Sequence, residues 1–192
     1  EFFHLHSNLL AEMNNPHNWT EEIKSFMPAQ VGFRPEPPGA GGFRLAGRFL
    51  LFKHIGTLAN RLREIIRQIR NDANVGGNEP QINIMILTGI AGGTGSGCSL
   101  DIAYLLRAIL KGDFQLDARQ YSMNGYIILP DVNAVDAGNN RYLGRNGYAY
   151  LKELDYLNSL RENGELFEQR YTDFYRYSGN VAPFVPYLFS SE

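Results

Sequence analysis

The chain has 192 residues, of which 44% are hydrophobic and 12% aromatic, a composition typical of one globular domain with a substantial core and not of a disordered protein. Its net charge of −2, from 18 basic and 20 acidic side chains, does not favour binding to nucleic acid or to a membrane surface. A single cysteine excludes an internal disulfide, and since the sequence has neither a signal peptide nor an apolar run of about 18 residues, we expect a soluble protein of the cytoplasm.

Residues 1–46 are the least regular part of the chain. We expect an irregular lead-in segment there, rich in turn residues, that includes the glycine-rich run Gly39–Gly42. The sequence starts at Glu1 and not at a methionine, which predicts that the chain is an excised piece of a longer protein.

Helical and strand-like patterns alternate after residue 46. The expected elements are, in order, an amphipathic helix over 55–69, a mostly buried strand over 82–87, a helix over 98–111, a second apolar strand over 126–129, a helix over 140–161 that ends at Gly164, and an edge strand or irregular segment over 183–189. In the helix over 140–161, the residues expected to face inward are Tyr148, Leu151, Leu154, Leu157 and Leu160. Alternation of helices with buried strands predicts an α/β fold, with a Rossmann-like parallel sheet and helices on both faces.

A cluster of glycines separates the first predicted strand from the helix that follows it. Four of the six residues from 92 to 97 are glycines: Gly92, Gly93, Gly95 and Gly97. Glycine has no side chain to keep a ligand away, so closely spaced peptide N–H groups are left exposed. The first-turn N–H groups of a helix have no partner within the helix, and the helix dipole places about half a positive charge there. The pattern therefore predicts a binding site for an anion such as phosphate.

The spacing of the glycines argues against two known phosphate loops. A Walker loop needs Lys and then Ser or Thr after its last glycine, but Gly97 is followed by Cys98 and Ser99. In a dinucleotide-binding fingerprint that starts at Gly93, the third glycine position falls on Cys98, which disfavours a Rossmann-type oxidoreductase without removing it as an alternative. A turn with no ligand would need one or two glycines, because each further glycine costs about 0.5–1 kcal/mol relative to alanine.

The glycine cluster resembles the signature of the tubulin and FtsZ superfamily, a small residue followed by Gly-Gly-Thr-Gly-Ser-Gly, which Ala91–Gly97 match at every position. The upstream sequence GAGGFRLAGR, at 39–48, is similar to the loop that faces the terminal phosphate in FtsZ-like proteins. Downstream, residues 127–142 resemble the strand and ribose-side loop of that superfamily, and residues 146–157 the next helix of bacterial tubulin-like proteins. The resemblance extends over residues 38–160.

The resemblance implies a partial GTP-binding domain over residues 47–192, with GTP or GDP as ligand and Mg²⁺ accompanying the nucleotide. Its partner would be a second copy of the protein, in head-to-tail assembly. The residues that the resemblance assigns to the nucleotide are Gly39, Ala40, Gly41, Gly42, Ala91, Gly92, Gly93, Thr94, Gly95, Ser96, Gly97, Asp136 and Arg141. Thr94 and Ser96 would add hydroxyl donors to the phosphate loop. For Asp136 and Arg141, solvated loop charges are an equally good interpretation.

The sequence also departs from the superfamily. Its members begin with a strand and another glycine-rich loop, and nothing before Pro38 resembles that unit. The acidic loop that activates water on the nucleotide of the next subunit is not recognisable either. We therefore assign no catalytic residue and expect this chain alone to be inactive, even where the longer protein is a GTPase. Two functions stay open, a polymerising GTPase and a tubulin-fold scaffold or binding module that does not hydrolyse nucleotide.

Three other features have simpler interpretations than a reactive site. Cys98 lies near a helix N-terminus, where thiols become reactive, but with no histidine nearby in sequence it is expected to be a small buried thiol. Asp101, in the first turns of the same helix, is expected to complement the helix dipole. His4 and His6 have no Cys or Glu at ligand spacing, so we expect no metal site of the protein's own.

Overall fold

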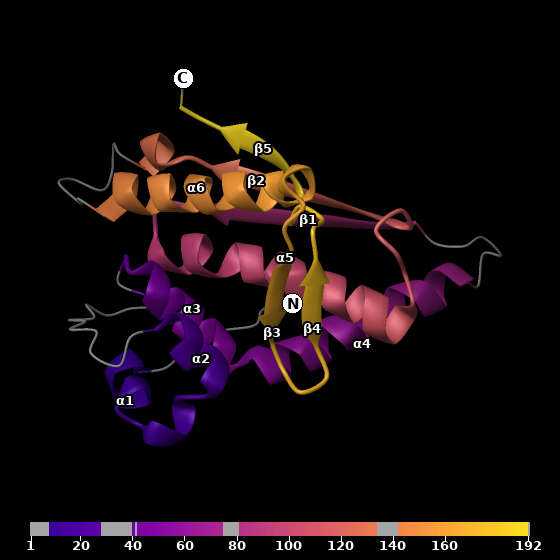
Figure 1. Ribbon diagram of the computed structural model, residues 1–192, viewed down its shortest axis with the longest axis horizontal. Helices are drawn as coiled ribbons and strands as arrows, with labels where there is room; N and C mark the ends of the chain where they lie inside the picture. The colour runs from indigo at the N-terminus through magenta and orange to yellow at the C-terminus, as the bar shows by residue number, and fades with distance from the viewer. Residues whose placement is uncertain (1–7, 28–39, 41, 75–80, 134–141, 192) are drawn as a thin grey trace.

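A computed structural model describes residues 8–27, 40, 42–74, 81–133 and 142–191 (Figure 1). In chain order its elements are α1 (Leu9–Met13), η1 (Pro16–Asn18), α2 (Glu21–Phe26), α3 (Arg44–Lys53), α4 (Ile55–Asn74), β1 (Ile82–Gly89), α5 (Gly93–Phe114), β2 (Tyr121–Ile128), η2 (Pro130–Asn133), α6 (Tyr142–Asn163), β3 (Phe167–Arg170), β4 (Arg176–Gly179) and β5 (Val185–Phe189). None of the helices in these ranges has the length and apolar character needed to span a membrane.

Three parallel strands form the main sheet, in the order β1-β2-β5. Ile82 pairs with Tyr121 at one end of the β1–β2 ladder, and Gly89 with Ile128 at the other. This arrangement confirms the α/β class and the Rossmann-like parallel sheet flanked by helices. β5 lies at the edge of the sheet, where the missing N–H of Pro186 is tolerated, so the edge strand expected over 183–189 is also confirmed.

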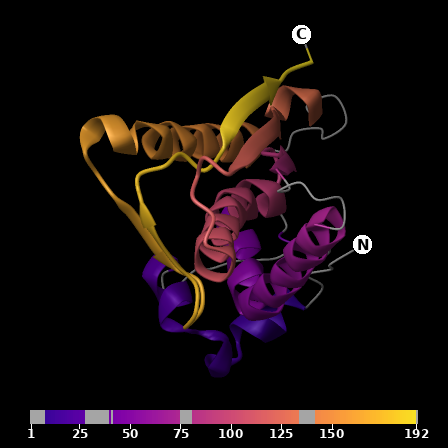
Figure 2. The same ribbon diagram turned by 90° about the vertical axis from the view of Figure 1, so that its right-hand side faces the viewer.

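Helices cover one face of the sheet in the part of the chain that the structure describes. Parallel strands are joined by right-handed crossovers, and because the strand order runs in one direction, α5 and α6 lie on the same side (Figure 2). On the other face of β1, Met85 and Leu87 are 69% and 72% exposed. The strand expected to be mostly buried therefore alternates in burial, and helices on the second face are not found among the described residues.

Helix α5 lies at the centre of the core. Its apolar residues Leu105, Ile109 and Leu110 are fully buried, and it packs against β1, α3, α4, α6 and β4. The helix begins at Gly93, five residues before the expected start, so most of the glycine cluster forms its first turns and not a separate turn. The predicted order of strand, glycine cluster and helix is confirmed.

The other helices differ from the sequence pattern in smaller ways. The helix expected over 55–69 is α4, and the separate helix α3 precedes it. In α6, Tyr148 is 69% exposed although it was expected to face inward, and Tyr150 is the buried tyrosine. The predicted stop at Gly164 is confirmed, since Gly164 has a φ of +69°, a conformation that glycine adopts without strain.

An antiparallel hairpin, β3–β4, was not predicted. Its aromatic residues pack on α5, with the ring of Tyr104 4.6 Å from that of Phe167 and 4.5 Å from that of Tyr177. At the N-terminal end of the chain, the described residues 8–27 form short helices that pack on α3 through Trp19 and Phe26. The domain boundary at residue 46 stays a prediction.

Candidate functional site

The glycine junction, Ala91–Gly97, lies at the carboxyl end of β1, the position where parallel α/β sheets bind ligands. Gly92 is the N-cap of α5 in an extended conformation, with φ −86° and ψ 173°, and no side chain caps the helix there. The N–H groups at the start of α5 therefore have no intrahelical partner. A Cβ atom added at Gly92 would meet no atom of the described residues within 4 Å, so this end of the helix is open.

Three other glycines of the junction are required by close packing. A Cβ atom at Gly93 would lie 2.5 Å from the carbonyl oxygen of Phe43, and one at Gly97 would overlap the carbonyl oxygen of Arg44. A Cβ atom at Gly95 would overlap the carbonyl oxygen of Gly89. The expectation that a ligand-free role needs only one or two glycines was therefore wrong, because the backbones of α3 and β1 approach α5 too closely for a side chain.

The hydroxyl groups of the junction have different environments. Thr94 is exposed, whereas Ser96 is buried and its hydroxyl donates to the carbonyl oxygen of Gly92. Beneath them, Thr88 is 6% exposed and its Oγ1 has no hydrogen-bond partner among the described residues. Of the two hydroxyl donors expected for a phosphate, only that of Thr94 is freely accessible.

Asn146 of α6 joins the glycine junction to the upstream loop. Its Nδ2 donates to the carbonyl oxygen of Gly42 at 2.7 Å and to that of Ala91 at 2.8 Å. Gly42 has a φ of +79°, and Phe43 N donates to the carbonyl oxygen of Ala40 at 2.8 Å, which closes a turn before α3. The two loops that were expected to share a ligand are thus adjacent, although they are about fifty residues apart in sequence.

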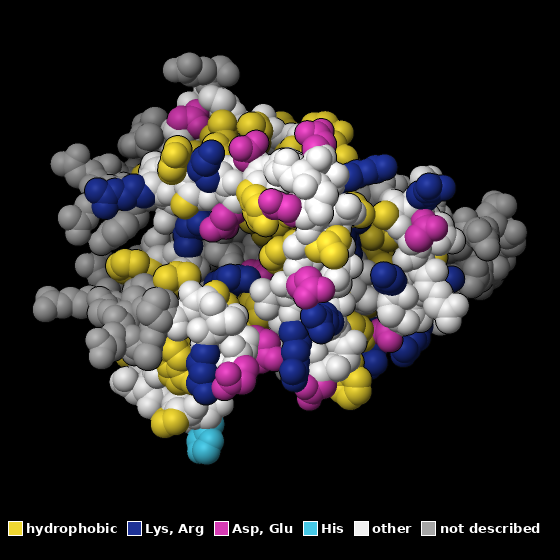
Figure 3. Space-filling model, in the orientation of Figure 1, with side chains coloured by type: hydrophobic (Ala, Val, Ile, Leu, Met, Phe, Trp, Pro, Cys, Tyr) yellow, Lys and Arg dark blue, Asp and Glu magenta, His cyan; other side chains and the backbone are white. Residues whose placement is uncertain are grey.

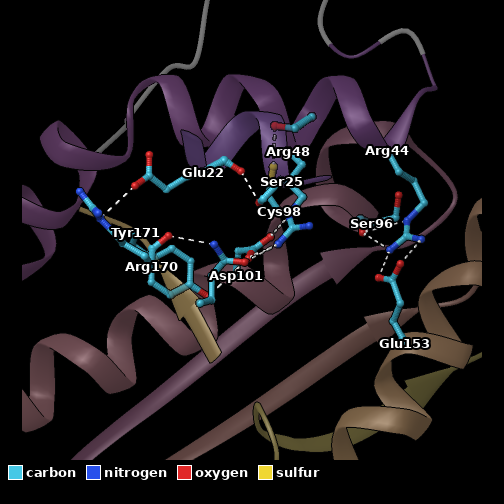
Figure 4. A network of polar contacts seen from close by, with 12 residues as sticks. Glu22, Ser25, Arg44, Arg48, Ser96, Cys98, Asp101, Glu153, Arg170 and Tyr171 are labelled. Carbon is cyan, nitrogen blue, oxygen red and sulfur yellow. Dashed lines mark hydrogen bonds and ion pairs between the residues drawn. The ribbon is translucent and has the colours of Figure 1, made fainter. Parts of the chain in front are cut away.

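Two arginines of α3 hold the start of α5 (Figure 4). Arg44 donates to the carbonyl oxygen of Ser96 through Nε at 3.1 Å and Nη2 at 3.0 Å, and it forms an ion pair with Glu153 of α6. Arg48 binds Asp101 with two hydrogen bonds, 2.7 Å from Nε to Oδ2 and 3.0 Å from Nη2 to Oδ1. Asp101 is the ninth residue of α5, and no acidic residue lies in the first turn of that helix, so the expectation that Asp101 complements the helix dipole was wrong. Its partner is Arg48.

Asp101 is buried, and burial and the charge of Arg48 have opposite effects on the pKa of its carboxyl group. Burial raises the pKa of its carboxyl group, an effect that the guanidinium of Arg48 opposes. The hydroxyl of Tyr171 donates a long hydrogen bond of 3.4 Å to the same carboxylate. Arg48 also lies over the rings of Phe26 and Phe52, at 4.3 and 5.3 Å from their centroids. This cluster ties α2, α3, α5 and the segment after β3 together.

A cavity of about 530 Å³ lies beside the glycine junction, between α3, α5, α6 and β3. Its wall includes Gly42, Ser96 and Asn146, together with apolar residues such as Leu100 and Phe167. The charged side chains in the wall are in ion pairs, Arg44 with Glu153 and Arg48 with Asp101. The cavity is therefore not itself a site for a strongly charged group.

A family model described as tubulin like matches residues 5–192. The chain belongs to this tubulin-like family. Searches of curated proteins and of solved structures gave no significant match. The resemblance drawn from Ala91–Gly97 is thus confirmed for the tubulin-like family, and the bacterial and FtsZ-like detail stays a prediction.

The structure of the tubulin-like chain describes some of the predicted site residues and not others. Ala40, Gly42 and Ala91–Gly97 meet where α3, α5 and α6 begin, whereas Gly39, Gly41, Asp136 and Arg141 lie outside the described residues. His4 and His6 lie outside them too. Within the described ranges, no group of three His, Cys, Asp or Glu residues could hold a metal ion.

Cys98 of the tubulin-like chain is a packing residue. It is buried, its Sγ donates to the carbonyl oxygen of Gly47 at 3.2 Å, and burial raises the pKa of its thiol to about 12. The expectation of a small buried thiol is confirmed.

Sequence reasoning missed Arg44, Arg48 and Asn146. The one local signal for Asn146 is its spacing, because it precedes the buried residues Tyr150 and Leu154 by four and eight positions and so lies on the inward face of α6. A polar side chain on such a face needs a buried partner. The partners themselves were not predictable, since both are carbonyl groups of distant loops.

Proposed function

We propose that this tubulin-like protein binds GTP and GDP, with the phosphates held by backbone N–H groups at the start of α5 and Mg²⁺ accompanying the nucleotide. On this proposal the longer protein, of which this chain is expected to be a piece, assembles head to tail and hydrolyses GTP at the interface between subunits, whereas this chain alone is expected to be inactive. The observation that carries the proposal is the open, uncapped N-terminus of α5 at Gly92, at the carboxyl end of β1.

The physical basis is the set of unpaired N–H groups. Hydrogen bonds to a charged phosphate are short and about twice as strong as bonds between neutral groups. Without a Cβ atom at Gly92, a phosphate oxygen can approach the peptide closely. The arginines near the junction, Arg44 and Arg48, are already paired with carboxylates, so the backbone and the helix dipole would provide most of the favourable charge.

Packing supports the proposal by making the site rigid. Gly93, Gly95 and Gly97 pack closely against the backbones of α3 and β1. Arg44 also donates a hydrogen bond to the carbonyl group of Ser96. The N–H groups at the start of α5 are thereby fixed before any ligand arrives. A preorganised site does not lose ordering entropy when it binds, so affinity is gained.

A scaffold that does not hydrolyse nucleotide is the second candidate. The packing role of Gly93, Gly95 and Gly97 favours it, because that role would require the same glycines in a protein that had lost nucleotide hydrolysis. The two candidates differ in one measurable property, the release of phosphate from GTP by the intact protein during assembly.

Gly92→Ala is expected to weaken nucleotide binding without harming the fold. The added methyl group meets no described atom, and a φ of −86° suits alanine, but the methyl group would stand where a phosphate approaches the helix end. We expect the Kd for a fluorescent GTP analogue to rise about tenfold, equivalent to about 1.4 kcal/mol, with the fold retained and the melting temperature lowered only slightly, because alanine is less favourable than glycine at a helix N-cap.

Gly112→Ala is the matched control for this variant. Gly112 lies in the same helix, and a Cβ atom there also meets no described atom within 4 Å. Its Kd should equal that of the wild type. Equal GTP affinity in wild type, Gly92→Ala and Gly112→Ala would contradict binding at the N-terminus of α5.

A further inference from the structure

We propose that Asn146 is a positioning residue, which fixes the direction of the Gly92 N–H and the distance between the upstream loop and the glycine junction. The proposal depends on one juxtaposition, the Asn146 side-chain amide between the carbonyl groups of Gly42 and Ala91. It rests on the proposed nucleotide-binding function, because it concerns how the two loops present themselves to one ligand.

A side-chain NH₂ group suits this position because it can donate two hydrogen bonds. The Asn146 side chain is 8% exposed, and two carbonyl oxygens, which only accept hydrogen bonds, lie 2.7 and 2.8 Å from its nitrogen. The nitrogen carries two hydrogens and can satisfy both oxygens at once. A serine hydroxyl has one hydrogen and a carboxylate has none, so neither can replace it.

The bond to Ala91 sets the direction of the neighbouring N–H. In a planar trans peptide, the C=O and the N–H point to opposite sides. Because the Ala91 carbonyl points at Asn146, the N–H of Gly92 points away from α6. Gly92 is exposed and a Cβ atom there would meet no described atom within 4 Å, so this N–H is available to a ligand.

The bond to Gly42 ties the upstream loop to the same side chain. Gly42 holds a φ of +79°, which a residue other than glycine rarely adopts. Close packing beside Asn146 keeps α6 in place, since a Cβ atom at Gly147 would lie 3.0 Å from Cδ of Pro130 and closer still to its Cγ. Asn146 thus couples α6, the upstream loop and the glycine junction.

The coupling has a measurable consequence. The family resemblance places the upstream loop at the terminal phosphate, which GTP has and GDP lacks, and the proposed function places phosphates at the glycine junction. If Asn146 holds the loops at a fixed distance, its loss should weaken GTP more than GDP. A residue that only stabilised the fold would reduce the fraction of active protein and leave the ratio of the two affinities unchanged.

The test measures Kd for GTP and for GDP by calorimetric titration of the intact protein, in the wild type, Asn146→Leu and Asn146→Asp. Leucine removes both donors without adding charge, and aspartate keeps the shape. Asn146→Ser, which retains one donor, is the milder variant if the others do not fold. The control is Asn158→Asp, the same change at an exposed position of α6.

We expect the preference for GTP over GDP to fall about tenfold in the Asn146 variants, as for the loss of about one hydrogen bond to a charged group, and to be unchanged in Asn158→Asp. An unchanged preference in folded Asn146 variants would overturn this inference and leave the proposed function intact. If the wild type binds neither nucleotide, the proposed function fails, and the role of Asn146 fails with it.

Discussion

Gly97→Ala is expected to destabilise the fold by about 3 kcal/mol, the upper end of the range for overpacked interiors. The new Cβ atom would overlap the carbonyl oxygen of Arg44 and lie 3.2 Å from the backbone nitrogen of Arg48. Backbone atoms cannot rotate out of the way as side chains do. Relief would require α3 to move off α5, which would break the hydrogen bond from Cys98 to Gly47 and the Arg48–Asp101 pair.

Urea unfolding followed by circular dichroism measures this effect. Gly112→Ala is again the control, because alanine there has no steric conflict and is favoured over glycine in a helix by up to about 1 kcal/mol. We expect the free energy of unfolding to fall in Gly97→Ala and to rise in Gly112→Ala. Equal stabilities would show that α3 and α5 are not as close as described.

Arg48→Met should be the most damaging substitution of a charged residue, with a loss of about 3–5 kcal/mol. It leaves the buried carboxylate of Asp101 without its bidentate partner, and the 3.4 Å bond from Tyr171 is too long to compensate. Methionine keeps much of the apolar contact with Phe26 and Phe52, so the loss reports mainly on the charge. The free energy of unfolding gives the measurement.

The loss of stability in Arg48→Met should become smaller as pH falls. Without Arg48, the folded-state pKa of Asp101 is raised above its unfolded value by burial, so the folded protein binds a proton that the unfolded chain does not. The stability of Arg48→Met relative to the wild type should therefore recover as pH falls from 7 towards the unfolded pKa of about 4. A defect that grows on acidification would contradict this origin.

Arg176→Met provides the matched control for Arg48→Met. Arg176 also pairs with a carboxylate, that of Glu168, but the two side chains are 63% and 50% exposed. Exposed pairs contribute about 0–1 kcal/mol, so this variant should unfold almost like the wild type. If Arg48→Met were no worse than Arg176→Met, the buried pair would not be holding α3 to α5.

The sequence predicts those parts of the fold that depend on local pattern. The strand before Gly92, the helix after it and the stop at Gly164 are all encoded within short windows. The hairpin β3–β4 is not, because its strands of four residues, FEQR and RYSG, have mixed polarity and are held by aromatic contacts with Tyr104 of α5. The exposed face of β1 was missed because its Met85 and Leu87 are apolar and suggest burial.

The candidate site, like the fold, is predictable from the sequence only where it depends on local pattern. The glycines are visible in the sequence, but their two roles are not, since Gly92 differs from Gly97 only in what lies next to each in space. Arg44, Arg48 and Asn146 bind groups that are between 52 and 121 residues away. No local pattern specifies such partners.

Hydrogen exchange of the intact protein with and without GTP tests whether the N–H groups at the start of α5 bind phosphate, with guanosine as the control ligand that lacks phosphates. We expect GTP to slow exchange of the amides from Gly92 to Gly95, because phosphate oxygens would accept their hydrogen bonds, and guanosine to leave the exchange of these amides unchanged. Unaltered exchange of these amides at saturating GTP would contradict phosphate binding at the start of α5.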